Sequence, residues 1–341
     1  MITAKIITAQ SPITIVLPCY RVAAYVRDAV LSIMAQRYQA WTAIIVDDGS
    51  PDDIYTPIAD LLHSEPRLKY IRKTNGGVAS ARNYGCRVSP AASGYIMFLD
   101  ADDVLKQGAL DRMADYLDST PSVGLIHCEA EVIDEAGCVL DREFPVCRSS
   151  FCGREIPPTE PETPFESIYT LSFIIPSLCM MRRAVFDKTG GYDESFGHNM
   201  EDTDLHLRMA LLAPVHFLPF KLVQYRLRFG QATADSKFLF EQAERLWKKW
   251  REAEQLPREL RDFVNAVEDF RCYTLTARSG FEAANRHFSE GKWALALRFW
   301  QGALRRLFMA QWRQRGHRYP PRHPNLTMMP FGALSPQRFQ K

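Results

Sequence analysis

Short apolar runs alternate with amphipathic segments along the first third of the chain. Apolar runs bounded by turn residues are typical of strands buried on both faces of a sheet, whereas apolar residues three and four positions apart predict helices. The pattern predicts strands at 13–17, 41–46, 68–71 and 94–99, separated by helices at 23–36, at about 53–63 and at 78–88. This alternation predicts an α/β fold with a parallel sheet and right-handed crossovers.

The pattern becomes less regular after residue 105. It predicts a helix at 106–117, a strand at 124–127, a helix from 199 to about 212 and an extended segment at 215–227. Prolines at 145, 157, 158, 161 and 164 favour loops and a hairpin over 129–164.

From about residue 236 the composition favours helices, near 238–247, 257–278, 281–289 and 292–312. The last two resemble one helical hairpin of a tetratricopeptide array, which is weak evidence because such repeats need neighbours. We therefore expect a tail at 1–12, an α/β domain at 13–232, a C-terminal helical region at 233–318 and an irregular tail at 319–341.

The composition is that of an ordinary soluble protein, with 341 residues, 46% hydrophobic residues and a net charge of +2. The eight cysteines form no CxxC pair and no zinc-type spacing, which favours a reducing compartment. We expect a cytoplasmic protein because residues 1–12 lack the apolar core of a signal peptide and no apolar stretch is long enough to span a membrane.

Two acidic clusters follow predicted strands. Asp100, Asp102 and Asp103 end the apolar run at 94–99, and Asp47-Asp48-Gly49-Ser50 ends the run at 41–46. The carboxyl ends of parallel strands share one edge of the sheet, so the clusters can be neighbours. Asp100 and Asp102 can point the same way, and close carboxylates suit a hard cation such as Mg²⁺ or Mn²⁺. The alternatives are a solvated acidic loop and an ordinary turn or helix cap.

Two helix starts add candidates. Gly76 and Gly77 precede the helix at 78–88 and allow close approach of a ligand, and Arg82 in that helix can reach a diphosphate or the aspartates. The alternative is a plain loop-to-helix entry. Glu201 and Asp202 lie at the start of a later helix, where acids favour the helix dipole. A carboxylate there can also act as a general base beside a bound sugar.

The ordered set of motifs resembles glycosyltransferase family 2, with the GT-A fold, over roughly residues 11–230. The motifs are Pro18-Cys19-Tyr20, Asp47-Asp48-Gly49-Ser50, Asn75-Gly76-Gly77 with Ala81-Arg82-Asn83, Asp100-Ala101-Asp102, and Glu201-Asp202. The resemblance implies a Rossmann-like, mixed but mostly parallel sheet with a helical appendage. It also implies an inverting, metal-dependent transfer of a sugar from a nucleotide-sugar, with a UDP-sugar preferred, to an acceptor hydroxyl.

The resemblance also assigns residue roles. Nucleotide-sugar contacts fall to Pro18, Tyr20, Asp47, Asp48, Gly76, Gly77, Arg82, Asp100, Ala101 and Arg228. Asp102 and Asp100 would bind the Mn²⁺ or Mg²⁺, Asp202 would be the general base, and Glu201 would orient the base or the acceptor.

Two residues depart from the family pattern. Arg21 replaces a frequent Asn, and Arg228 replaces a frequent His that helps to hold metal or diphosphate. Arg228 cannot ligate a metal but can pair with phosphate. The Gln-x-x-Arg-Trp motif of processive enzymes is absent, which favours single addition. One alternative is a catalytically inactive GT-A protein that binds a nucleotide-sugar or a partner protein. Another is a nucleotidyltransferase, disfavoured because the loop at 18–21 has no glycine.

Aromatic residues and arginines alternate over 293–318, and no acidic residue follows Glu290. A basic amphipathic helix can lie on an anionic membrane surface, at the inner face in this case, and would suit a lipid-linked acceptor. Packing of the aromatic side on a helical bundle is the alternative, which we favour. No nucleic-acid recognition motif accompanies the charge, so we expect a sugar or lipid-linked acceptor and no nucleic acid.

Overall fold

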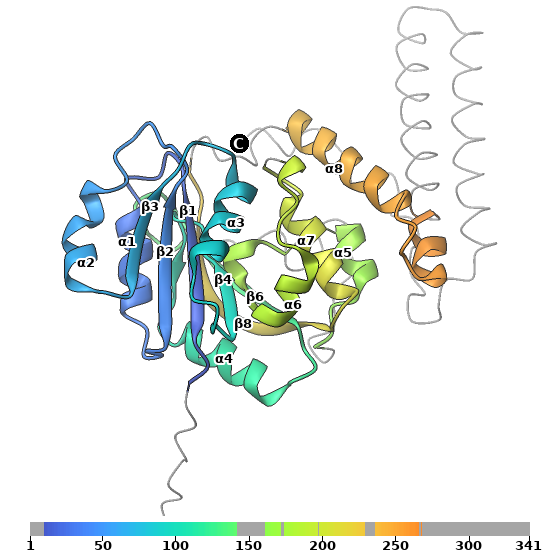
Figure 1. Ribbon diagram of the computed structural model, residues 1–341, viewed down its shortest axis with the longest axis horizontal. Helices are drawn as coiled ribbons and strands as arrows, with labels where there is room; N and C mark the ends of the chain where they lie inside the picture. The colour runs from blue at the N-terminus through green and yellow to red at the C-terminus, as the bar shows by residue number, and fades with distance from the viewer. Residues whose placement is uncertain are drawn as a thin grey trace, which may run out of the picture. The chain divides into compact units, whose positions relative to one another are not determined.

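The computed structural model describes residues 10–141, 161–171, 174–196, 198–228, 236–265 and 267 (Figure 1). The chain divides into two compact units, Met1–Gln242 and Ala243–Lys341. The predicted domain limits at 232 and 318 stay predictions.

The first unit is built on one sheet, which has eight strands within the described residues, in the order β3-β2-β1-β4-β7-β6-β8-β5. The strands are β1 (Ile13–Cys19), β2 (Trp41–Asp47), β3 (Leu68–Arg72), β4 (Tyr95–Phe98), β5 (Val104–Leu105), β6 (Leu125–Ile133), β7 (Cys179–Arg182) and β8 (Val215–Arg226). Strands β1 to β4 are parallel, as are β6 and β8, whereas β7 and β5 run antiparallel to their neighbours. The predicted mixed, mostly parallel sheet is confirmed.

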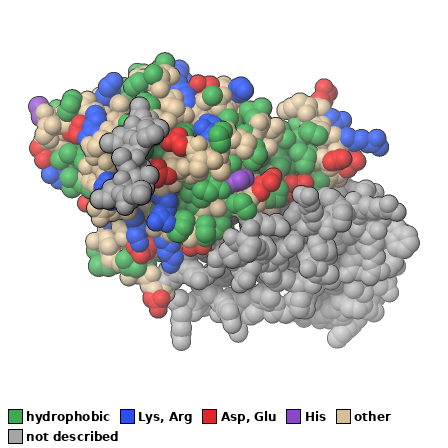
Figure 2. Space-filling view, turned by 90° about the horizontal axis from the view of Figure 1, so that it is seen from below, with side chains coloured by type: hydrophobic (Ala, Val, Ile, Leu, Met, Phe, Trp, Pro, Cys, Tyr) green, Lys and Arg blue, Asp and Glu red, His purple; other side chains and the backbone are tan. Residues whose placement is uncertain are grey.

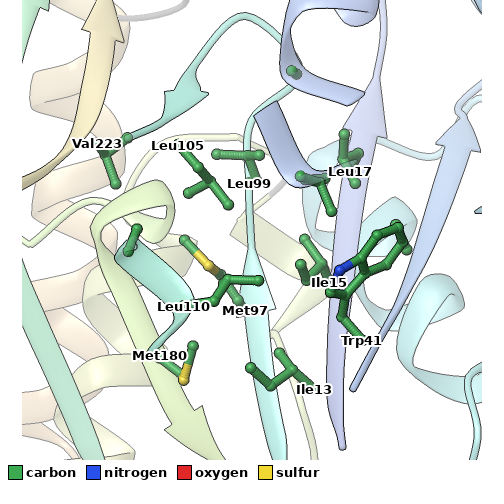
Figure 3. Close-up of a cluster of buried hydrophobic side chains, with 14 of the residues drawn as sticks. Ile13, Ile15, Leu17, Trp41, Met97, Leu99, Leu105, Leu110, Met180 and Val223 are labelled. Atoms are coloured by element: carbon green, nitrogen blue, oxygen red, sulfur yellow. The ribbon is translucent and has the colours of Figure 1, made fainter. Parts of the chain in front are cut away.

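Helices cover both faces of this sheet. The helices of the first unit are α1 (Val26–Met34), α2 (Ala59–Ser64), α3 (Val78–Val88), α4 (Ala109–Ser119), α5 (Phe165–Leu171), α6 (Arg183–Thr189) and α7 (Glu201–Ala210), and α8 (Ser236–Arg251) crosses the boundary between the two units. Short 3₁₀ turns are η1 (Thr56–Ile58), η2 (Pro176–Leu178) and η3 (Glu194–Phe196). Apolar side chains from α1, α2 and α4 pack on one face against alternate residues of β1, β2 and β4, such as Ile15 and Met97 (Figure 3).

The opposite face of the sheet carries α3 and α6. Gly85 of α3 approaches β1 so closely that a Cβ atom there would lie 2.4 Å from a methyl carbon of Val16. A side chain cannot fit in that space, so glycine allows α3 to lie directly on the strands. Phe186 of α6 packs on Phe98, with ring centroids 5.7 Å apart. The start of α3 is thereby fixed at the carboxyl ends of β1 and β2.

The predicted element limits need several corrections. Strand β1 continues through Pro18 to Cys19, because beyond Val16 it pairs only with β2 and no ladder with β4 is interrupted. The helix predicted from 106 begins at Ala109, because the preceding residues form β5 against β8. Strand β6 runs to Ile133, into the segment predicted as loops. The helix predicted at about 53–63 is divided into η1 and α2.

In the second unit the structure describes the end of α8 and a helix over 258–265. The helices predicted near 281–289 and 292–312, the tetratricopeptide-like hairpin and the tail from 319 lie outside the described residues. No helix in the described ranges has the length and apolar character that crossing a membrane requires. On the face shown in Figure 2, basic and acidic side chains are interspersed among apolar ones.

Candidate active site

The two acidic clusters share one edge of the sheet, around the end of β1. Strand β1 lies between β2 and β4, so the tips of all three strands are adjacent. The pKa of the Cys19 thiol, at the tip of β1, is affected by carboxylates from both clusters. Burial raises its pKa well above the usual value, and the carboxylates of Asp47, Asp102, Asp52 and Asp100 raise it further. Residues 47 and 100, far apart in the sequence, therefore act on the same point.

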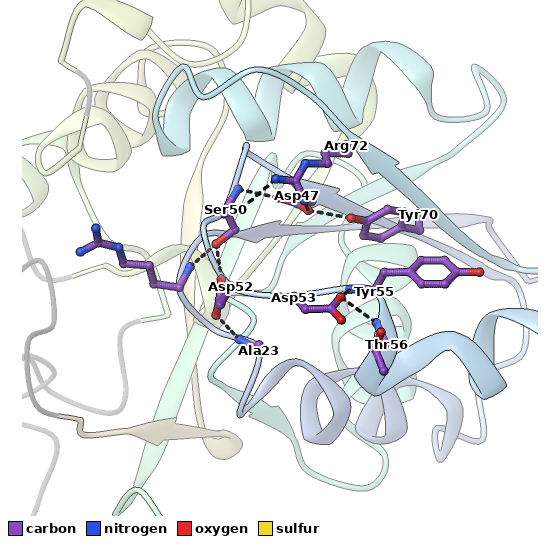
Figure 4. Close-up of polar contacts among 10 residues, drawn as sticks. Ala23, Asp47, Ser50, Asp52, Asp53, Tyr55, Thr56, Tyr70 and Arg72 are labelled. Carbon is purple, nitrogen blue, oxygen red and sulfur yellow. Dashed lines mark hydrogen bonds and ion pairs between the residues drawn. The ribbon is translucent and has the colours of Figure 1, made fainter.

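Asp47 is completely buried at the tip of β2 and is fully engaged by its neighbours (Figure 4). Its Oδ1 accepts a hydrogen bond from the Ser50 N–H at 2.7 Å. Its Oδ2 accepts hydrogen bonds from the Tyr70 hydroxyl at 2.6 Å and from Nη1 of Arg72 at 3.1 Å. Burial and this bond to Asp47 raise the pKa of Tyr70 to about 12. The Asp47 carboxylate thus joins the tips of β2 and β3.

Ser50 and Asp52 connect this loop to the loop after β1 (Figure 4). The Ser50 hydroxyl accepts a hydrogen bond from the Arg21 N–H at 2.7 Å and donates one to Asp52. Asp52 accepts another from the Ala23 N–H at 2.8 Å. Arg21 has a φ of 57°, a left-handed conformation that asparagine adopts more readily than arginine. These bonds join the two loops, and Tyr20, next to Arg21, is 43% exposed.

Asp48 holds the loop that precedes α3. Its Oδ2 accepts the N–H of Gly77 at 2.8 Å, and its Oδ1 accepts the N–H of Gly76 at 3.0 Å and a bond from Lys73. Gly77 has a φ of 87°, which favours glycine at this helix start. Asp48 is only 3% exposed. Its oxygens are therefore occupied by the chain itself.

Arg82 joins the second acidic cluster to helix α7. Its Nη2 donates to Asp100 Oδ1 at 2.7 Å, and its Nη1 donates to Glu201 Oε1 at 2.8 Å. Burial alone would lower the pKa of Arg82, but Asp100 and Glu201 together raise it. The carboxylates of residues 100 and 201, more than a hundred positions apart, are thus held by one guanidinium.

Asp102 and Asp103 face two arginines of β8 and the segment that follows it. Asp102 accepts a hydrogen bond from Nε of Arg228, and Asp103 accepts one from the Arg226 N–H at 3.0 Å. Burial and the neighbouring Asp100 raise the pKa of Asp102, while Arg228 opposes the rise. Asp100 is partly exposed, Asp102 is largely buried, and Asp103 is almost wholly buried.

Glu201 and Asp202 begin helix α7, as predicted. Burial and the charge of Asp202 raise the pKa of Glu201 to about 7. Burial also raises the pKa of Asp202, although Arg82 opposes the rise. Oδ1 of Asp202 accepts the Thr203 N–H at 2.6 Å, whereas Oδ2 makes no hydrogen bond within the described part of the chain. Asp204 is buried and paired with Arg208, so it faces away from the site.

A divalent cation fits this site only in part. Among the described residues no group of three or more His, Cys, Asp or Glu side chains is arranged to hold a metal. Asp100 and Asp102 supply two carboxylates, each also paired with an arginine. Since Mg²⁺ commonly takes one or two protein carboxylates and completes its shell with phosphate oxygens and water, two carboxylates suffice for a cation that arrives with a diphosphate.

Several residues around the site have no counterpart in the sequence-based assignment. Arg226 donates to the carbonyls of Asp102 and Glu135 at 2.9 Å each and to Asp28 at 3.0 Å. Ser177 accepts the N–H of Asp100 at 3.0 Å. Lys73 binds Asp48, and the Tyr192 ring lies against the guanidinium of Arg82. Of these, Lys73, two residues before the Asn75-Gly76-Gly77 turn, and Arg226, two residues before Arg228, could have been suspected from their positions in the sequence.

Comparisons with known proteins agree with this architecture. The family model for glycosyl transferase family 2 matches residues 14–190, just over half of the chain. An uncharacterized glycosyltransferase of Rickettsia prowazekii is 29% identical over 240 residues, covering 69% of this chain and 70% of that protein. The minor teichoic acid biosynthesis protein GgaB of Bacillus subtilis is 34% identical over 108 residues, which cover 31% of this chain and 12% of GgaB.

Solved structures share the fold at low sequence identity. TarS residues 1–349 of S. aureus, in complex with UDP-GlcNAc, aligns with a TM-score of 0.60 and 19% identity over 88% of this chain and 83% of that one. The mannosyltransferase PcManGT of Pyrobaculum calidifontis, in complex with GDP-Man and Mn²⁺, aligns with a TM-score of 0.60 and 16% identity over 90% and 88%. Together with the family match, the fold and the ordered motifs show that this chain belongs to glycosyl transferase family 2.

Proposed function

We propose that the protein is an inverting glycosyltransferase that transfers a sugar, in a single addition, from a nucleotide-sugar to an acceptor hydroxyl. The observation that carries the proposal is the double pairing of Arg82 with Asp100 and Glu201. This pairing brings the acidic tip of β4 beside the acidic start of α7. This arrangement supports the proposal, because transfer requires the proposed donor-binding carboxylate, Asp100, near the proposed base, Asp202, which follows Glu201.

Asp202 is the proposed general base. Its Oδ2 has no hydrogen-bond partner within the described chain, and its raised pKa makes it a better proton acceptor than an exposed aspartate. The acceptor oxygen attacks the anomeric carbon and loses its proton to Asp202. The bond from that carbon to the diphosphate breaks, and its electron pair leaves with the diphosphate. One displacement of this kind inverts the anomeric configuration.

Asp102 and Asp100 are the proposed ligands of Mn²⁺ or Mg²⁺, which when bound would stabilise the negative charge of the departing diphosphate. Arg228 lies beside Asp102 and is proposed as a phosphate partner. Pro18, Tyr20 and Ala101 remain proposed as nucleotide-sugar contacts, and Asp47, whose oxygens are engaged by the protein, keeps that proposed role through the loops that it joins. Asp48, Gly76 and Gly77 keep that proposed role through the loop that Asp48 holds.

A UDP-sugar is the first donor to test, because TarS is solved with UDP-GlcNAc, and GDP-mannose is the second, because PcManGT is solved with GDP-Man. Thermal shifts with UDP, GDP and their sugars, with and without Mn²⁺, would identify the base. Donor hydrolysis and transfer to sugar and lipid-linked acceptors would follow, with the anomeric configuration of the product read by NMR. Retention of configuration would disprove the inverting mechanism.

A second candidate function is nucleotide-sugar binding without transfer. The observation that favours it is the ion pair between Asp102 and Arg228, because it places a cationic side chain on a proposed metal ligand. Donor binding with neither hydrolysis nor transfer in the presence of Mn²⁺ would support this candidate. Turnover that is lost in Asp202→Asn would exclude it.

A further inference from the structure

Arg82 is buried although its side chain carries a full charge. It lies in α3 and is only 3% exposed. A buried guanidinium is tolerated where carboxylates neutralise it and accept its hydrogen bonds. Here the two outer nitrogens are both engaged, one by Asp100 at 2.7 Å and one by Glu201 at 2.8 Å. Both outer nitrogens therefore bind protein carboxylates, whereas the Nε–H is buried and has no hydrogen-bond partner within the described residues.

The guanidinium is planar and rigid, so its two outer nitrogens set the spacing between the groups that they bind. One of these groups, Asp100, belongs to the proposed donor side of the site and is 33% exposed at its side chain. The other, Glu201, is buried and adjoins the proposed base Asp202. Arg82 therefore links the donor carboxylates to the start of α7, a helix that Arg208 also ties to the carbonyls of Thr189 and Gly191.

The segment that this fork anchors is strained. Asn199 and Met200, directly before α7, have φ values of 67° and 69°, which are unusual for residues other than glycine. Consecutive left-handed residues persist where surrounding contacts hold them. The bond from Arg82 to Glu201, the first residue of the helix, is such a contact. Its loss would let the start of α7, and Asp202 with it, relax away from the site.

The ring of Tyr192 packs against the Arg82 guanidinium. The Arg82 guanidinium carbon lies 5.2 Å from the centre of the Tyr192 ring, which meets the Phe98 ring edge-on at 5.0 Å. Asn83 binds the Tyr192 backbone on both sides, accepting its N–H at 2.8 Å and donating to its carbonyl at 2.9 Å. Helix α3 therefore carries both the arginine and the residue that fixes the ring beneath it.

We propose that Arg82 is a positioning residue, which holds the start of α7 at a fixed distance from Asp100 and makes no direct contact with the diphosphate. The inference rests on the proposed function and refines the role of one residue in it. It contrasts with the role that the family resemblance implies, in which Arg82 borders the diphosphate. The two roles differ in what a lysine at the same position can do.

The test compares Arg82→Lys with Arg82→Gln. Lysine supplies a point charge that serves well for phosphate but cannot form a two-pronged fork. If Arg82 is a positioning residue, both variants lose kcat by about a hundredfold, because small displacements of a base cost that much. Both retain the Kd for UDP measured without metal, or for GDP if that nucleotide binds, within about twofold. If Arg82 contacts the diphosphate, Lys stays near wild type and Gln binds the nucleotide at least tenfold more weakly, which would overturn the inference.

The matched control is Arg87→Gln, on the same helix but with a side chain 61% exposed, which is expected to change neither quantity. Thermal unfolding of each variant tests the fold. Should the single variants fail to fold, Arg82→Gln combined with Glu201→Gln removes both buried charges, and the criterion is then its nucleotide Kd alone, because Glu201 has its own proposed role in catalysis. Failure of the wild type to bind either nucleotide would instead contradict the proposed function, on which this inference depends.

Discussion

Two pairs of acidic residues lie at the ends of β2 and β4, the strands on either side of β1, yet the protein uses them differently. Asp47 and Asp48, after β2, accept hydrogen bonds from the backbone N–H groups of Ser50, Gly76 and Gly77 and from nearby side chains. Asp100 and Asp102, after β4, face arginines and each other, and one of them is partly exposed. The first pair ties loops together, and the second remains at the rim.

The hydrogen-bond partners of a carboxylate, more than its position at a strand end, indicate whether it has a structural role or can take part in ligand binding and catalysis. An aspartate saturated by backbone N–H groups gains a fixed loop and gives up its free lone pairs. A carboxylate held only by arginine side chains can exchange that partner for a cation or a ligand. The carboxyl groups of Asp102, Glu201 and Asp202, whose pKa values are raised, all lie at the end of β4 or at the start of α7. The predictions below test this division.

The largest expected effect is on the base. Asp202→Asn should lower kcat by about a thousandfold, since loss of a general base typically costs two to four orders of magnitude. Nucleotide affinity should stay unchanged, because the side chain faces the acceptor in the proposed mechanism. Steady-state kinetics with titration of UDP would measure both. Asp115→Asn, exposed on α4, is the control, and a kcat unchanged in Asp202→Asn would refute the assignment.

The next effect is a dependence of stability on pH that arises from Glu201. Its pKa is about 7 in the folded protein against 4.5 for an unperturbed glutamate. Between these values the folded state holds the proton and the unfolded chain does not, so the free energy of unfolding falls as pH rises. The contribution of protonated Glu201 to the free energy of unfolding is fully present below about pH 4.5 and is lost above about pH 7. Between these values it falls by about 1.4 kcal/mol per pH unit.

Urea unfolding of wild type and Glu201→Gln from pH 4 to pH 8 would measure this difference. Glutamine does not titrate, so the gap between the two proteins isolates the glutamate. The free energy of unfolding of the variant, relative to that of the wild type, should increase as pH rises. Parallel pH profiles for the two proteins would show that the buried charge is already neutralised by Arg82 throughout this range.

A smaller effect is expected in the scaffold pair. Asp48→Asn turns an amide N–H₂ toward groups that already donate, the N–H of Gly76 and Gly77 and the Lys73 ammonium. A buried donor left without an acceptor costs about 1–3 kcal/mol, so we expect a loss of about 2 kcal/mol in the free energy of unfolding. Chemical denaturation would measure it. Asp60→Asn, in an exposed ion pair with Arg27, should be nearly neutral. Equal losses in both variants would contradict the scaffold role.

The sequence predicted most of the sheet because its central strands are buried on both faces and read as continuous apolar runs. The two-residue strand β5 was missed because it is too short to be distinguished from a loop, whereas the extension of β6 was missed although residues 128–132 alternate between apolar and acidic side chains. Helix α3 was predicted with its observed limits, because Gly77 and Val88 bound a clear helical pattern.

The candidate residues were predictable where topology alone brings them together, as at the tips of β2 and β4. What the sequence could not provide was the choice of partner. Nothing in the motif Ala81-Arg82-Asn83 indicates that its arginine reaches Glu201, 119 residues away. The buried Tyr192 ring beneath that arginine depends equally on tertiary packing. Partners of this kind follow from the fold and have no local pattern.

The smallest expected effect concerns Arg228, whose Nε binds Asp102. Arg228→Ala frees this carboxylate and removes a nearby positive charge, so the nucleotide-free protein should bind Mn²⁺ about fivefold more tightly, equivalent to about 1 kcal/mol for a partly buried ion pair. Isothermal titration with Mn²⁺ alone would measure it. Arg228→Lys keeps the charge and should stay near wild type. Affinity for UDP without metal should fall in Arg228→Ala, because a phosphate partner is lost. Weaker Mn²⁺ binding by that variant would mean that Arg228 orders the metal site, and that the second acidic pair, like the first, is held chiefly as scaffold.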